Sequence, residues 1–142
     1  MSEKFISLIV IVLVIIIELL IKKSLSGKEF SPKQKGIFIM PTVNTGFLYS
    51  LARGKNGFAK ILCTIILVLC ITFFFIYEVP FLCGIGISLI LGGGASNTLD
   101  RFLRKGVLDY IAIKRKNKIT IYNLADFCIF CGGIIVIISY II

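Results

Sequence analysis

Four long apolar runs constrain this chain more than any other feature of its sequence. They extend over residues 5–21, 61–77, 79–99 and 119–142. Only Glu18 and Asp126 carry a charge within them. Each run approaches or reaches the ~20 residues that a helix needs to cross the hydrocarbon core of a bilayer. We therefore predict an all-α membrane protein with four transmembrane helices, at about residues 5–22, 58–78, 79–101 and 120–142.

The composition agrees with this assignment and excludes an ordinary soluble globule. Hydrophobic residues make up 58% of the 142-residue chain, and the mean hydropathy is +1.02. The first run ends in two lysines and lacks an A-x-A-like cleavage site, so we interpret it as a retained helix and not as a cleaved signal. The prediction is one integral membrane domain over residues 1–142.

The polar segments predict a small surface structure at one end of these helices. Residues 23–57 are punctuated by glycines and prolines, and the runs 36–41 and 43–49 are rich in β-formers. We expect a β-rich platform there, between the first and second helices. Residues 103–118 should form a shorter surface segment between the third and fourth helices.

The chain has no histidine, and its five cysteines all lie within the predicted spans. A disulfide framework has little rationale at these positions, and a zinc hydrolase without histidine is improbable. We expect no metal and no cofactor. Any chemistry must then come from carboxylates, amides or hydroxyls.

Basic residues gather at one end of the predicted bundle. Of sixteen Lys and Arg, Lys4 alone precedes the first run, and the other fifteen lie within residues 22–60 or 101–118. Four spans place both segments on the same side, so this face should attract anionic membrane lipids. No aromatic-interleaved basic module is visible, so nucleic acid is not an expected partner. By the positive-inside rule the basic face would be cytoplasmic.

Three carboxylates and two amides fall on this same end. Asn97, Asp100 and Arg101 share one face of the third helix, and Asn123 and Asp126 repeat the i, i+3 spacing at the fourth. Asp109 lies between them. The cluster could be interfacial ion pairs, or it could hold two carboxylates that share one proton. Such a pair can activate water without a metal or a serine nucleophile.

Glu18 and Lys22 add a further charged pair, spaced i, i+4 near the end of the first helix. They could form an ion pair that snorkels to the interface. Alternatively, an acid within a span marks a functional site. The sequence leaves both interpretations open.

Three short motifs follow one another along the chain, GGGASNTLDR at 92–101, VLDY at 107–110 and YNLAD at 122–126. They resemble the motifs G-G-A-x-G-N-x-x-D-R, V-x-D-F and F-N-x-A-D of the bacterial lipoprotein signal peptidases, also called signal peptidase II. Asn44-Thr45-Gly46 resembles the family's upstream N-x-G, and Glu18 to Lys22 occupies the place of its D-x-x-[ST]-K. The order and spacing agree over nearly the whole chain.

This resemblance implies an aspartic endopeptidase that cuts the signal peptide of a prolipoprotein before its diacylglyceryl-modified lipobox cysteine. Asp109 and Asp126 would be catalytic. The residues that would bind substrate or orient the site are Glu18, Lys22, Asn44, Gly46, Asn97, Asp100, Arg101 and Asn123. The β-rich segment would be an extracytoplasmic cradle, with the active site at the outer face of a bacterial plasma membrane, opposite to the orientation that the charge rule predicts.

The chain also departs from the family's pattern, which keeps other functions open. Glu18 stands for an Asp, Ser96 for a Gly and Thr120 for a Pro, and Phe47-Leu48-Tyr49 is bulkier than the family's Ala-Ala-Phe. A divergent member could bind lipidated or signal-bearing helices without cutting them. A small proton-coupled channel or transporter subunit is a weaker alternative, because no inverted repeat is visible. We expect a monomer.

Overall fold

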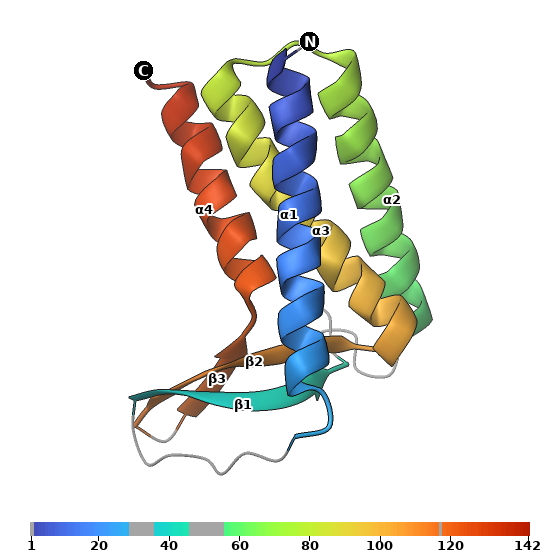
Figure 1. Cartoon of the computed structure of the whole chain (residues 1–142), viewed down its shortest axis with the longest axis vertical. Coiled ribbons are helices and arrows are strands. Elements are labelled where there is room, and N and C mark those ends of the chain that lie inside the picture. The colour runs from blue at the N-terminus through green and yellow to red at the C-terminus, as the bar shows by residue number, and fades with distance from the viewer. Residues whose placement is uncertain (1, 29–35, 46–55, 117) are drawn as a thin grey trace.

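The computed structural model describes residues 2–28, 36–45, 56–116 and 118–142. Within them, four helices stand side by side, three strands lie across one end, and both ends of the chain lie at the other (Figure 1). The elements, in chain order, are α1 (Ser2–Leu25), β1 (Gly36–Asn44), α2 (Asn56–Ile76), α3 (Phe81–Arg104), β2 (Val107–Arg115), β3 (Lys118–Tyr122) and α4 (Leu124–Ser139).

Helix α3 organises the bundle, because it packs against α1, α2 and α4. Its buried glycines allow this close approach. A Cβ on Gly93 would lie 2.6 Å from the Ala125 carbonyl oxygen of α4. Farther along the same contact, a Cβ on Gly132 of α4 would lie 2.5 Å from the carbonyl oxygen of Gly86. The glycines of the third apolar run therefore bring the backbones of α3 and α4 together.

The outer surface of the bundle is apolar, whereas polar side chains lie inside it. On α1, Leu13 and Leu20 are 50% and 62% exposed, while Ser7, Glu18 and Lys22 are buried. This distribution is the reverse of that in a soluble helical bundle and is suited to a lipid environment.

Length and composition identify two of the helices as candidate membrane spans. They are Glu3–Leu25 and Phe81–Arg104, whereas the apolar stretches Lys60–Ile76 and Leu124–Ser139 are shorter. The mostly helical architecture with a small sheet is thus confirmed. Four complete crossings stay a prediction.

The three strands form one antiparallel sheet in the order β1-β2-β3. Two sequence predictions require correction here. The segment between the third and fourth helices forms β2 and β3, so it supplies two of the three strands and not merely a surface connection. The runs 36–41 and 43–49 were expected as separate strands, but β1 continues from Gly36 to Asn44 with an irregular register between Ile39 and Thr42. Residues 46–49 lie outside the described residues.

The helix of the fourth apolar run begins later in the sequence than the composition of the run suggested. Helix α4 starts at Leu124, whereas residues 118–122 pair with residues 111–115 of β2. The segment KITIY alternates in polarity and contains β-branched residues, a pattern typical of strands. Its isoleucines were counted with the apolar run, so the strand was missed.

Candidate active site

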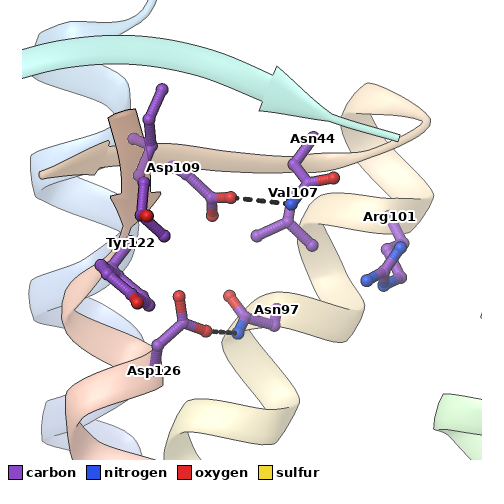
Figure 2. A pocket seen from close by; sticks show the side chains of 9 residues that line it. Asn44, Asn97, Arg101, Val107, Asp109, Tyr122 and Asp126 are labelled. Atoms are coloured by element: carbon purple, nitrogen blue, oxygen red, sulfur yellow. Dashed lines mark hydrogen bonds between the residues drawn. The ribbon is translucent and has the colours of Figure 1, made fainter. Parts of the chain in front are cut away.

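The junction of the sheet and the helices encloses a cavity of about 280 Å³ (Figure 2). Residues from β1, α3, β2, β3 and α4 line it: Asn44, Asn97, Arg101, Val107, Asp109, Thr120, Ile121, Tyr122 and Asp126. Segments that are far apart in the sequence therefore meet at one site. The cavity combines an apolar wall with carboxylates, amides and a guanidinium group.

Two carboxylates point into this cavity from opposite sides (Figure 2). Asp109 lies on the central strand β2, opposite Thr42 of β1, and is only 5% exposed. Asp126 lies in the first turn of α4 and is half-buried. The sheet and the helix thus each contribute one acid to the same space.

Asn123 connects the two acids. Its side-chain oxygen accepts a hydrogen bond from the backbone N–H of Asp126, and the Asp126 carboxylate accepts one from the Asn123 N–H, which forms a capping box at the start of α4. The Asn123 amide nitrogen donates to Asp109 at 2.7 Å and to the side-chain oxygen of Asn97 at 3.1 Å. The i, i+3 spacing seen in the sequence therefore serves both as a helix cap and as a link between the acids.

The two asparagines that line the cavity, Asn44 and Asn97, each donate to one acid (Figure 2). The Asn44 amide donates to Asp109 at 3.0 Å, and the Asn97 amide donates to Asp126 at 3.0 Å. Both carboxylates are thereby held in fixed orientations that face the cavity.

Burial raises the pKa of Asp109 from 3.8 to about 6. The donors Asn44 and Asn123 oppose this shift, and the nearby charge of Asp126 adds to it. A carboxyl group with a pKa near 6 can change its protonation state at working pH, as a general acid must.

A fully buried charged cluster lies behind the two acids. The Lys22 ammonium lies 3.0 Å from Asp100 and 3.7 Å from Glu18, and all three side chains are 0% exposed. It also donates to Asn97 at 3.3 Å, which joins the cluster to the site. The snorkelling interpretation of the Glu18–Lys22 pair is therefore wrong, because neither side chain reaches the surface.

The two acids of this cluster also hold backbone elements together. Glu18 accepts hydrogen bonds from the Tyr110 hydroxyl at 3.3 Å and from the backbone N–H of Ala125, so α1 is joined to β2 and to α4. Asp100 accepts from the backbone N–H of Leu108 at 2.9 Å, which joins α3 to β2. The strand that carries Asp109 is thus attached on both sides of that residue.

Two residues of this arrangement were not predicted as site residues. Arg104 forms an ion pair with Asp100. The sequence suggested Arg101, the residue that directly follows Asp100, as the partner of this acid, but Arg101 lines the cavity. The i, i+4 spacing of Asp100 and Arg104 was the available signal. Tyr110 could not be predicted, since its contacts depend on how β2 crosses the bundle.

The predicted residues otherwise meet in one region, with one exception that cannot be placed. Gly46 lies outside the described residues. Across the part of the chain that is described, no group of three or more His, Cys, Asp or Glu side chains could hold a metal ion. The side chains that line the cavity provide paired carboxylates and amide donors.

Known proteins are similar to this chain in sequence and in fold. Residues 6–142 match the family described as signal peptidase (SPase) II. The chain is 31% identical over 139 residues to the lipoprotein signal peptidase of Staphylococcus carnosus, covering 95% of this chain and 87% of that protein. It is 27% identical over 150 residues to that of Staphylococcus haemolyticus, covering 98% and 94%.

Two solved structures, each described as a bacterial membrane enzyme studied by the in meso method, superpose with TM-scores of 0.79 and 0.77 at 27% identity. They cover 95% and 94% of this chain, and the chain covers 87% and 91% of them. Together with the match over nearly the whole sequence, these findings show that the chain belongs to the signal peptidase II family, the lipoprotein signal peptidases.

Proposed function

We propose that this protein is an aspartic endopeptidase of the membrane that removes the signal peptide of prolipoproteins, cutting just before the diacylglyceryl-modified cysteine. The observation that carries the proposal is the placement of Asp109 and Asp126 on opposite sides of one cavity, each held by asparagine donors. Two carboxylates that face one site suit the activation of water against a peptide carbonyl.

In the proposed mechanism, the two acids have different roles. Asp126, ionised, takes a proton from water as the water attacks the scissile carbonyl carbon. Asp109, protonated, transfers its proton to the carbonyl oxygen as the tetrahedral intermediate forms, a role that its raised pKa supports. Asp126 then gives its proton to the leaving nitrogen, the C–N bond breaks, and Asp109 recovers its proton when the new carboxyl group forms.

The amides and the buried cluster have supporting roles in this proposal. The two carboxylates are oriented by Asn44, Asn97 and Asn123. The Lys22 ammonium donates a hydrogen bond to the side-chain oxygen of Asn97 and so holds that amide in place. Arg101 contributes a positive charge to the wall of the cavity. The protein would work as a monomer without a cofactor.

The proposed location is a bacterial plasma membrane that the chain crosses several times, with the sheet and the active site at its outer face. The apolar outer surface of the bundle supports a lipid environment. A lipidated substrate in the same bilayer could then enter the cavity from the side, and the basic residues near the sheet would face anionic headgroups.

The test is cleavage of a diacylglyceryl-modified prolipoprotein by the purified protein in detergent, with the product masses measured. We expect one cut, immediately before the modified cysteine. The matched substrate without the diacylglyceryl group should be cut far more slowly. Binding of the lipidated substrate without any cut would contradict the proposal and favour a silent binding protein.

A further inference from the structure

One face of the sheet connects the active-site cavity to the tip of the β2–β3 hairpin. Alternate residues of a strand share a face, so Asp109, Ile111, Ile113 and Arg115 project to the same side of β2. On β3, the residues that share this face are the partners of Ile111, Ile113 and Arg115. They are Tyr122, Thr120 and Lys118, respectively. At about 3.4 Å per residue, Arg115 lies roughly 20 Å along the strand from Asp109.

A second cavity, of about 580 Å³, lies at the hairpin end of this face. Its lining residues are Ile113, Arg115, Lys116, Lys118, Thr120 and Tyr122. Thr120 and Tyr122 also line the active-site cavity, so the two cavities are neighbours. A molecule bound in the second cavity would lie beside a substrate bound in the first.

The second cavity is strongly cationic. Arg115, Lys116 and Lys118 are exposed, and Lys114 is adjacent to them. Among the described residues, none of these four takes part in a salt bridge, in contrast to Lys22 and Arg104 behind the active site. The described residues therefore leave the positive charge of the hairpin tip without a neutralising ion pair.

Apolar side chains lie next to these cations on the same face. Ile37 and Ile39 of β1 pair with Ile113 and Ile111 of β2 and are 70% and 41% exposed. In Figure 1 the sheet lies across the end of the bundle and extends past the start of α4. A surface that combines cations with exposed isoleucines beside lipid-facing helices suits a ligand with an anionic head and an apolar body.

We propose that the second cavity binds an anionic phospholipid of the bilayer, with its phosphate on Arg115, Lys116 and Lys118 and its glycerol and acyl region toward Ile37 and Ile113. This deepens the proposed function and rests on it for the position of the sheet at a membrane surface. An acidic peptide would use the cations but would leave the isoleucines exposed. The bound lipid would form one wall of the path into the active site.

The test measures lipid binding by the purified full chain in neutral detergent, by native mass spectrometry. The probes are dioctanoyl phosphatidylglycerol and dioctanoyl phosphatidylcholine. We expect the wild type to prefer the anionic lipid. The triple variant Arg115→Gln, Lys116→Gln, Lys118→Gln should bind it about 100-fold more weakly, because each surface cation contributes about fivefold.

The matched control removes the same charge at the same end of the bundle, through Lys23→Gln, Lys28→Gln and Lys105→Gln. The control should keep the lipid preference. An equal loss in both triple variants would overturn the site, since diffuse charge would then explain the binding. Displacement of the lipid by glycerol phosphate or by an acidic peptide at equal concentration would also overturn it.

The binding measurement does not depend on catalysis. The variant Asp109→Asn should keep the full preference for the anionic lipid, although it is expected to be inactive. Failure of the lipid site and failure of the proposed peptidase activity would therefore be separate results.

Discussion

Replacement of Lys22 by methionine tests whether the buried charged cluster supports the fold and the site. Lys22 is the cation between Glu18 and Asp100, and none of the three side chains is exposed. Methionine keeps the length and apolar character of the lysine stem but removes the charge. The cluster of two acids and two cations, which includes Arg104, would then carry a net charge of −1.

The expected cost follows from the partners that remain. Removal of one member of a buried ion pair typically costs about 3–5 kcal/mol, because a charge is left uncompensated. Asp100 keeps Arg104 and the Leu108 N–H, and Glu18 keeps its two hydrogen-bond donors. We therefore expect a loss near the lower end, about 3 kcal/mol, which is a large part of a typical folding free energy.

The assay is reversible unfolding of the purified protein in mixed detergent and SDS micelles. The adjacent Lys23→Met variant is the control, since Lys23 is exposed and should change the free energy of unfolding by less than about 0.5 kcal/mol. Combining Lys22→Met with Glu18→Gln restores charge balance and should recover part of the loss. Equal effects of Lys22→Met and Lys23→Met, or strict additivity in the double variant, would refute the reasoning.

Three further predictions concern packing, pH and orientation. Gly132→Ala should destabilise the protein by about 1–3 kcal/mol, because the added Cβ would lie 2.5 Å from a backbone carbonyl oxygen of α3. Gly133→Ala should leave the stability unchanged, because a Cβ there would meet nothing within 4 Å. Equal unfolding free energies of the two variants would contradict this prediction. The pKa of Asp109 is about 6 and the acid must be protonated, so kcat/KM should fall about tenfold per pH unit above about pH 6. The same ionisation should lower the stability of the wild type, relative to Asp109→Asn, as pH rises through 6. A flat pH–rate profile from pH 4.5 to 8 would count against the assignment. In intact cells on a cysteine-free background, Ser26→Cys should react with an impermeant thiol reagent and Glu78→Cys should not; the reverse pattern would place the active site in the cytoplasm, as the positive-inside rule predicts.

The helices were predictable because apolar runs leave few alternatives, but the sheet was predicted only in outline. The sequence of residues 107–115 does not alternate clearly between apolar and polar residues. The reason is that consecutive residues of Val107–Tyr110 are all buried at the junction with the bundle, so neither face of the strand there is exposed. The isoleucines of β3 merged with those of α4 in a hydropathy count. Strand pairing depends on contacts between distant segments, and such contacts are not visible in local composition.

Spacing and motifs pointed to most of the polar residues that line the cavity, whereas the contacts that hold them were not predictable. The i, i+3 relation of Asn123 and Asp126 indicated a shared face, and the structure adds the capping box and the link to Asp109. The burial of Glu18 and Lys22 depends on how α1 packs against α3 and β2. A charged pair near the end of an isolated helix would reach the interface, as the sequence allowed.

The most direct test of the account is single-turnover cleavage of the lipidated prolipoprotein by the wild type and by Asp109→Asn and Asp126→Asn. Asparagine keeps the size of the side chain but removes the proton that each acid must accept or donate. We predict that each variant stays folded and loses about 10²- to 10⁴-fold in rate, while Glu78→Gln, at an exposed acid in the connection between α2 and α3, keeps full activity. Full activity in either aspartate variant would contradict the assignment of the catalytic pair.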